Sequence, residues 1–303
     1  MYHYILYLVF SFLLGLLLTP ALRRIGIKYK IYDNPTGDDL KIHKKPIPYL
    51  GGIAIFFAFA LGLAISLSLY KLWSLPLFFI LSLGLFNLGV GLLDDLKNIK
   101  FYYRIILQVL GAILLILAGI KIKFIPIPIF TVLLTILYVV GAANAINMED
   151  GLDGLAGGLV MISAIGFIIL AFLIHNQTGL LLALTLLGAT LGFLIYNFPP
   201  ASIFMGNNGS YFLGYMLAIL AIVFFKPGDI KSLLGPILII GLPVFDAGLS
   251  ILRRTTKKKS PFLGDRGHLY DRLNRRFAVR KTVLVCYLFQ IVIVVCGIFL
   301  NVA

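Results

Sequence analysis

Long apolar runs, separated by short polar stretches, occupy most of the chain. Ten of them are long enough, or nearly so, to cross a membrane as a helix, and they cover residues 2–22, 50–70, 75–93, 103–120, 126–143, 157–175, 179–197, 210–225, 233–252 and 282–301. A spanning helix needs about 20 apolar residues. We find no soluble domain between the runs. The pattern therefore predicts an all-α integral membrane protein of about ten transmembrane helices, with residues 1–303 as one polytopic membrane domain.

The composition supports the same fold class. The chain is 60% hydrophobic and 13% charged, whereas a soluble domain has about 25% charged residues. The net charge of +14 raises the question of a nucleic-acid partner, but no basic stripe lies on a soluble module with aromatic side chains for stacking. We therefore predict no nucleic-acid partner. Basic loops beside membrane helices explain the charge more simply.

The loops between the runs fall into two alternating sets of unequal charge. All but five of the 26 Lys and Arg residues belong to one set and its flanks, and the positive-inside rule makes that side cytoplasmic, with both termini outside. Every acidic residue except Asp229 lies on or near the same side. A pore or a proton relay would place acids near mid-membrane. The one-sided cluster instead indicates a site for a charged, water-soluble substrate at the membrane surface.

The run from Asn144 to Gly158 is the most informative polar segment. Asn144, Asn147, Asp150 and Asp153 repeat every three residues, which on a helix or a tight turn brings their oxygens towards one side. Amide and carboxylate oxygens are hard ligands suited to Mg²⁺. A Gly/Asp turn between two spans is the simpler alternative. We prefer the functional interpretation, because four such polar groups in an apolar neighbourhood need partners.

Two further segments carry candidate chemistry. The adjacent Asp94 and Asp95 close the third run. They indicate either a magnesium- or phosphate-processing site or a solvated helix end balanced by nearby lysines. Segment 204–214 places Asn207 among glycines just before a run. This is typical of a helix start whose free N–H groups face an anion, or of an ordinary capped turn. Phe204 is a candidate to stack on a nucleotide base.

The first and last cytoplasmic loops are both basic. The first contains Lys41 and His43 and, on its own, has the character of a surface loop. The last contains Arg266 and His268. Arg offers bidentate donors to phosphate, and His can donate or accept a proton. We therefore expect Arg266 and His268 to contact a substrate.

Together these segments resemble the polyprenyl-phosphate N-acetylhexosamine-1-phosphate transferases of glycosyltransferase family 4. Five motifs appear in the family's order, from the loop at residues 33–52 to residues 266–268. The resemblance implies a cytoplasmic active site in the bacterial inner membrane. It implies transfer of a sugar phosphate from a UDP-N-acetylhexosamine, usually UDP-GlcNAc, to undecaprenyl phosphate, with release of UMP. It further implies Mg²⁺, with Mn²⁺ as an alternative, and a homodimer surrounded by membrane lipids.

The resemblance also assigns roles to individual residues. The catalytic set consists of Asp94, Asp95, Asp150 and His268. The substrate-binding set consists of Lys41, Arg104, Asn144, Asp153, Phe204 and Arg266. The metal ligands are Asn147 and Asn207. By the same resemblance Asp94 deprotonates or orients the lipid phosphate, Asp153 contacts uracil, Phe204 stacks on it, and Arg104 lies near the pyrophosphate.

Two positions depart from the family's pattern. The family normally has Asp where this chain has Asn207. The amide oxygen can still ligate Mg²⁺ but brings no charge, so we expect weaker binding. A catalytically dead, regulatory homologue is the alternative that this departure leaves open. The last loop keeps one histidine, His268, where the phospho-MurNAc-pentapeptide transferases usually have several in a row. That substrate is therefore disfavoured.

Two other classes fit the sequence less well. The CDP-alcohol phosphotransferases carry an Ala-Arg pair after the first Asp-Gly of their motif, and this chain does not. A lipid or anion transporter needs polar groups through mid-membrane and broken helices in paired halves. The runs at 159–173 and 180–196 are nearly devoid of such groups. Release of UMP by protein in detergent would exclude transport as the sole activity.

Overall fold

Helices account for nearly all of the computed structural model, which describes residues 2–34, 45–258, 260 and 266–302. Within these residues the helices are α1 (Tyr2–Lys28), α2 (Gly51–Tyr70), α3 (Leu75–Lys97), α4 (Phe101–Leu117), α5 (Pro128–Glu149), α6 (Leu155–Leu173), α7 (Gln177–Asn197), α8 (Gly206–Phe224), α9 (Ile230–Ile240), α10 (Leu242–Thr256), α11 (Leu269–Asn274) and α12 (Val279–Val302). Two short strands, β1 (Tyr32–Asp33) and β2 (Ile47–Pro48), pair antiparallel.

Eight of the described helices are long and apolar enough to cross a membrane by themselves: α1, α2, α3, α5, α6, α7, α8 and α12. The helices α9 and α10 pass the same test only as a pair bent by 88°, and α4 is a shorter apolar helix of 17 residues. All ten apolar runs are therefore helical. The prediction of an all-α, multi-pass membrane protein is confirmed.

The apolar run at 233–252 forms two helices, α9 and α10, which meet at Gly241. Gly241 has φ +70°, a conformation that favours glycine, and Pro243 lies in the first turn of α10, where its missing N–H costs little. The break leaves backbone groups without partners inside a helix, and Gln290 on α12 forms hydrogen bonds with them. It accepts from Leu242 N at 2.8 Å and donates to the last two carbonyl oxygens of α9 at 3.1 and 3.0 Å. A break within a membrane needs such partners.

The helix α8 forms the centre of the bundle. Its residues from 208 to 222 are all buried, and it packs against α3 and α5. Two glycines permit these approaches, because a Cβ on Gly91 would meet the carbonyl of Asn207 and one on Gly214 would meet the backbone of Ala142. By contrast, α12 exposes large apolar side chains along much of its length. The bilayer is the solvent that suits such a surface.

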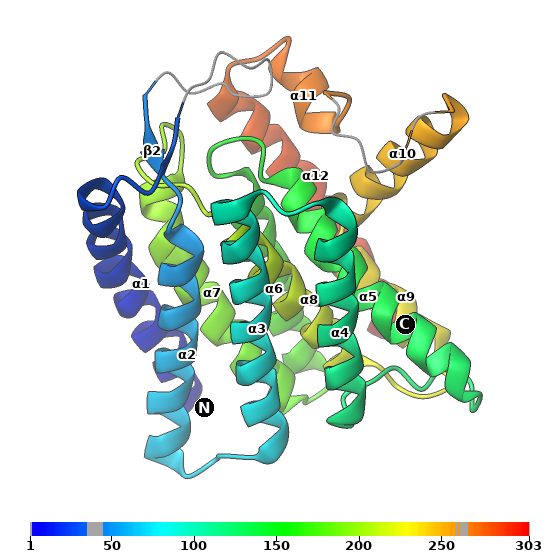
Figure 1. The fold of residues 1–303 in the computed structure, drawn as a ribbon. Helices are drawn as coiled ribbons and strands as arrows, with labels where there is room; N and C mark the ends of the chain where they lie inside the picture. The colour runs from blue at the N-terminus through cyan, green and yellow to red at the C-terminus, as the bar shows by residue number, and fades with distance from the viewer. Residues whose placement is uncertain (1, 35–44, 259, 261–265, 303) are drawn as a thin grey trace.

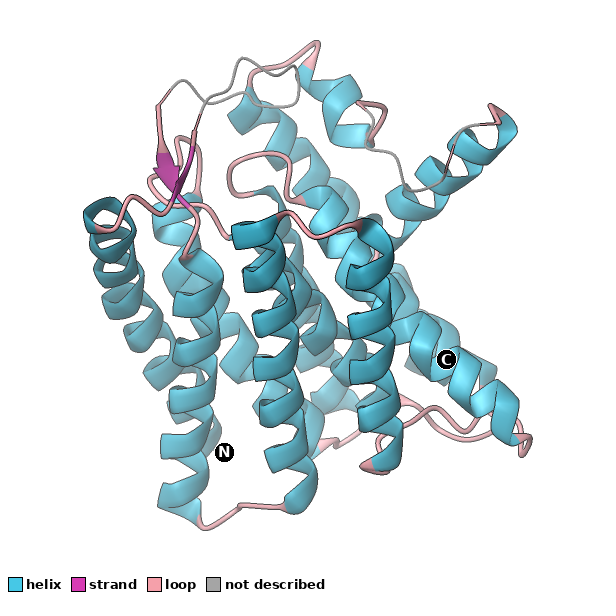
Figure 2. Cartoon of the chain, viewed as in Figure 1, coloured by secondary structure: helices cyan, strands magenta, loops and turns pink. Residues whose placement is uncertain are grey.

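One end of the bundle collects the polar segments, at the top of Figure 1. The carboxyl ends of α3 and α5 and the amino ends of α2, α6 and α8 meet there. Figure 2 shows that the two strands lie at this same end. The described parts of the connections that carry most of the Lys and Arg residues also lie there, as the charge pattern predicts. Both chain termini lie away from this end.

Candidate active site

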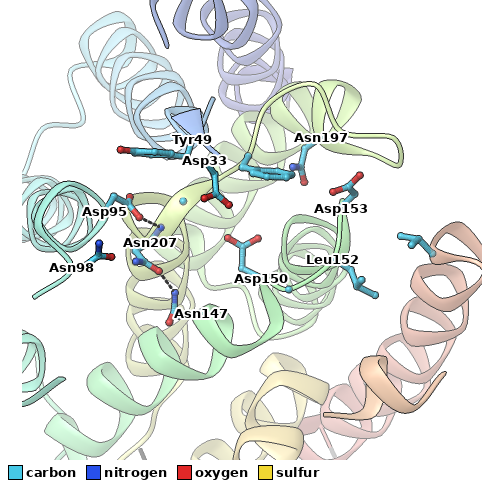
Figure 3. A pocket seen from close by; sticks show the side chains of 14 residues that line it. Asp33, Tyr49, Asp95, Asn98, Asn147, Asp150, Leu152, Asp153, Asn197 and Asn207 are labelled. Carbon is cyan, nitrogen blue, oxygen red and sulfur yellow. Dashed lines mark hydrogen bonds between the residues drawn. The ribbon is translucent and has the colours of Figure 1, made fainter. Parts of the chain in front are cut away.

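A pocket of about 550 Å³ opens among the polar segments at this end of the bundle. Six of the residues that we predict for the site line it: Asp95, Asn147, Asp150, Asp153, Phe204 and Asn207. The other lining residues are Asp33, Tyr49, Asn98, Gly151, Leu152, Asn197, Gly206 and Val279. Figure 3 shows the labelled carboxylates and amides around one shared space. The structure therefore brings six of the twelve predicted site residues to one pocket, which residues from five separate helices and their connections line.

The two aspartates at the end of α3 differ in position. Asp95 lines the pocket and caps the start of α8, where it accepts hydrogen bonds from Asn207 N at 2.9 Å and Asn208 N at 3.0 Å. The Asn208 side chain donates a third at 2.6 Å. A carboxylate at a helix amino end is stabilised by the helix dipole. The free N–H groups that we expect to face a substrate anion at this helix start are thus already bonded to Asp95.

Asp94 lies behind the pocket wall. It is 3% exposed and is not a lining residue. Its Oδ2 accepts from Tyr211 at 2.9 Å, from Asn207 Nδ2 at 3.1 Å and from Arg104 Nη1 at 3.1 Å. The Arg104 contact is an ion pair, and the Arg104 side chain is 22% exposed. Asp94 therefore fixes both the guanidinium of Arg104 and the amide of Asn207.

The two predicted metal ligands are in direct contact. Asn147 Nδ2 donates to Asn207 Oδ1 at 2.6 Å and to Ser210 Oγ at 2.9 Å. Both amide hydrogens of Asn147 are engaged inside the protein, so a cation in the pocket would meet its amide oxygen. Asn144, one turn earlier, donates to Gln108 at 2.6 Å and does not line the pocket. The three-residue repeat thus brings Asn147, but not Asn144, to the pocket.

The turn after α5 supplies two carboxylates. Burial, with smaller contributions from Asp95 and Asp153, raises the pKa of Asp150 well above its ordinary value. Asp153 Oδ2 accepts from Ala201 N at 2.8 Å, which ties this turn to the loop before α8. Asn197 holds the same two segments, since it accepts from Gly154 N at 3.0 Å and donates to the loop at 2.9 Å. The acidic groups are therefore held in a fixed frame.

The pocket carries negative charge without a matching base in its wall. Four of its fourteen lining residues are aspartates, Asp33, Asp95, Asp150 and Asp153, and none of the fourteen is Lys, Arg or His. Carboxylate and amide oxygens converging on one space form a donor set that suits Mg²⁺. The residues present therefore fit a hard divalent cation. Such a cation would also offset the repulsion among the carboxylates.

The last loop reaches a different position from the one we expect. His268 is 4% exposed, and its Nδ1 is hydrogen-bonded to the carboxylate of Asp246 on α10. Arg266 pairs with Asp271 at 3.7 Å. Neither His268 nor Arg266 lines the pocket. Lys41, the substrate-binding candidate of the first loop, lies outside the described residues.

Sequence reasoning missed several residues of the site. Asn197 and Tyr49 line the pocket, yet neither belongs to a patterned polar run. The available signal for Asn197 was an amide closing an otherwise apolar helix, since buried polar groups need partners. Glu149 and Asp246 belong to the acids on the predicted cytoplasmic side, and the sequence indicates no partner for either. The structure places both against the last loop.

Comparison with known proteins gives a consistent result. Residues 76–225 match the family model described as Glycosyl transferase family 4. The chain is 36% identical over 292 residues to a probable undecaprenyl-phosphate N-acetylglucosaminyl 1-phosphate transferase of Bacillus subtilis (strain 168), covering 92% of this chain and 80% of that protein. It is 32% identical to an undecaprenyl-phosphate alpha-N-acetylglucosaminyl 1-phosphate transferase of Thermotoga maritima, covering 92% and 85%.

A third relative is named for a different substrate. A phospho-N-acetylmuramoyl-pentapeptide-transferase of Streptococcus mutans is 30% identical over 238 residues, covering 71% of this chain and 70% of that protein. These matches extend far beyond any single motif, since they cover 71–92% of this chain. The resemblance seen in the sequence is confirmed, and the chain belongs to glycosyl transferase family 4.

Proposed function

We propose that the protein transfers N-acetylglucosamine 1-phosphate from UDP-GlcNAc to undecaprenyl phosphate and releases UMP. Two relatives with high coverage are named for transfer of this sugar phosphate to this lipid. The described pocket is about 550 Å³, within the range of cavities that hold small-molecule ligands. The polar end of a multi-pass membrane protein is also where a water-soluble nucleotide and a lipid headgroup can meet.

The acidic wall of the pocket is the observation that carries the proposal. Both substrates are anions, and a wall with four aspartates and no basic residue repels them. A divalent cation removes that obstacle. We assign Mg²⁺ to Asn147, Asn207 and Asp150, with Mn²⁺ as an alternative. When bound, the ion neutralises the diphosphate and stabilises the leaving UMP.

The remaining residues bind and orient the substrates. Phe204 lines the pocket and would stack on the uracil, and Asp153 lines the same pocket. Asp94 holds Arg104 by an ion pair, so the guanidinium is preorganised to approach a phosphate. A phosphate monoester is already mostly dianionic near neutrality. Neutralising and aligning the two anions is therefore the main task of these side chains.

The basic loops define the proposed location. They lie at the same end of the bundle as the pocket. By the positive-inside rule, this arrangement supports a pocket at the cytoplasmic face, and we propose the inner membrane of a bacterium as its location. Basic loops at that surface would also attract both anionic substrates. Assembly as a homodimer stays a prediction from the family resemblance.

A donor panel tests this proposal. Detergent-purified protein is incubated with undecaprenyl phosphate, Mg²⁺ and one of UDP-GlcNAc, UDP-GalNAc or UDP-MurNAc-pentapeptide, and the released UMP is measured. We expect release with UDP-GlcNAc and its loss when EDTA is added. Preferential use of UDP-MurNAc-pentapeptide would assign the protein to the peptidoglycan branch of the family. Absence of release with every donor would contradict the assignment as an active transferase.

A further inference from the structure

A second group of chemically active side chains lies outside the pocket. Glu149 is the last residue of α5, Asp246 lies near the start of α10, and His268 directly precedes α11. One potential ligand atom of each lies within 4.8 Å of the others. The three residues are 1%, 5% and 4% exposed. None of them lines the pocket.

The contacts inside this group leave a charge problem. Asp246 Oδ1 accepts from Leu269 N at 2.9 Å, and Asp246 Oδ2 is hydrogen-bonded to His268 Nδ1. The Glu149 carboxyl group also contacts Asp246, while its Oε1 is buried without a hydrogen-bond partner. Two carboxyl groups in contact away from water repel each other, and a shared proton, a charged His268 or a bound cation offsets that repulsion.

A divalent cation would account for the contact between the two carboxyl groups and for the unpartnered Glu149 Oε1. It would balance the two carboxylates with a neutral imidazole, and it would supply a partner for Glu149 Oε1. The neighbouring Arg254 approaches the other side of the ring, with its Nη2 3.5 Å from His268 Nε2. The nitrogen nearest to the carboxylates is thus Nδ1, which faces Asp246 and also lies 3.3 Å from Ser250 Oγ.

The donor set selects the class of metal. One imidazole nitrogen with two carboxylate oxygens suits zinc or manganese, whereas Mg²⁺ favours all-oxygen sites with several waters. Three protein ligands leave a coordination position for water. The three residues come from α5, α10 and the last loop. An ion bound here would fix the end of α5, which leads into Asp150, to the segment before α11.

We propose that Glu149, Asp246 and His268 bind one divalent transition-metal ion of the zinc or manganese class, separate from the cation of the pocket. This inference does not rest on the transferase assignment. It concerns metal content and stability, so it can fail while transfer activity is present, and it can hold in an inactive protein.

Metal content of the full-length protein in detergent tests the proposal. Protein stripped with EDTA is reloaded with Zn²⁺, dialysed and measured by elemental analysis and by thermal denaturation. We expect one zinc per chain and a higher melting temperature. Glu149→Gln keeps the shape of the side chain and should weaken Zn²⁺ binding at least tenfold. The pocket variant Asn147→Ala serves as the matched control and should keep the zinc.

A spectroscopic measurement on the unmutated protein covers the case in which Glu149→Gln does not fold. X-ray absorption at the zinc edge detects the ring scattering of an imidazole ligand. No histidine is among the lining residues of the pocket, so an imidazole signal places the zinc outside the pocket, as the Glu149, Asp246 and His268 site predicts. Absence of stoichiometric zinc and manganese, or zinc with no imidazole ligand, would overturn the proposal.

Discussion

Asn207 joins the two halves of the candidate site. Its amide oxygen accepts from Asn147, and its amide nitrogen donates to the carboxylate of Asp94. An amide can serve both neighbours because it has a donor and an acceptor. A carboxylate at this position could still accept from Asn147, but it would repel the carboxylate of Asp94. The neutral residue therefore favours the metal-free arrangement of the site, at the expense of the charge that would attract a cation.

The substitution Asn207→Asp should make the stability of the site depend on metal. Without a cation the new carboxylate faces Asp94, and we expect a loss of about 1.5–3 kcal/mol, the usual worth of a hydrogen bond to a charged group. Addition of Mg²⁺ should raise the melting temperature more in this variant than in the wild type. Asn301→Asp, remote from the pocket, adds the same charge as a control. Equal Mg²⁺ responses in all three proteins would contradict the assigned metal site.

Asp94→Asn tests the role of the buried carboxylate. The variant keeps the shape of the side chain but removes the charge that pairs with Arg104. We expect UMP release to fall about 100-fold or more, because Arg104 loses the group that orients it, and the melting temperature to fall as well, because a buried ion pair is broken. Asp229→Asn removes an acid at the other end of the bundle, where it caps α9, and should stay active. Full activity of purified Asp94→Asn would end its assigned role.

Asp150 makes a testable contribution to the pH dependence of the stability of the metal-free protein. Its pKa is raised in the folded protein, above 3.8, because burial disfavours the charged form. The folded state then holds this proton to higher pH than the unfolded chain does, so metal-free stability should decline as pH rises through that interval. In EDTA, the melting temperature should fall less between about pH 4 and pH 7 for Asp150→Asn than for the wild type. A parallel decline in both proteins would show that Asp150 does not titrate in this way.

At the scale of elements, one side chain stabilises the break between α9 and α10. Gln290 reaches from α12 to the backbone on both sides of Gly241, and it also donates to Ser163 on α6 at 2.9 Å. The bend of 88° sets the direction of α10, which carries Asp246 towards the last loop. A buried amide on one helix thus positions a segment on another.

Gln290→Leu should therefore destabilise the protein well beyond the loss of one side-chain contact. It would leave a backbone N–H and two carbonyl groups without partners, at about 1–3 kcal/mol for each unsatisfied group. We expect a markedly lower melting temperature in detergent. Gln177→Leu makes the same exchange at an exposed helix start and should change little. If both variants had the melting temperature of the wild type, Gln290 would not stabilise the break between α9 and α10.

At the scale of the whole molecule, the sequence predicted where the helices lie better than which surfaces they bury. All ten apolar runs are helical, because membrane helices need long apolar segments wherever they sit. Both α8, buried at the centre, and α12, which faces outward, are apolar enough to span a membrane, with mean hydropathies of 1.4 and 2.8. Being apolar enough to span does not tell which helix is buried, because lipid and protein interior are both apolar. The break at Gly241 also depends on Gln290, which is 49 residues away in the chain.

The site was predictable where short motifs supply several groups at once. The end of α5 and the turn after it contribute Asn147, Asp150 and Asp153 to one pocket, as the repeat predicts. The role of Asp95 as the cap of α8 was not predictable, because its partners lie more than 110 residues later. The same holds for His268, whose burial against Asp246 follows from the bend between two helices.

Binding of UDP-GlcNAc with and without a divalent cation tests the central claim most directly. The purified protein is titrated with UDP-GlcNAc by calorimetry, first in Mg²⁺ and then in EDTA, without the lipid. The acidic wall predicts that affinity falls at least tenfold when the cation is removed, and that Asp150→Asn reduces this dependence. Equal affinity in Mg²⁺ and EDTA would contradict the claim that this pocket accepts a nucleotide sugar through a bound cation.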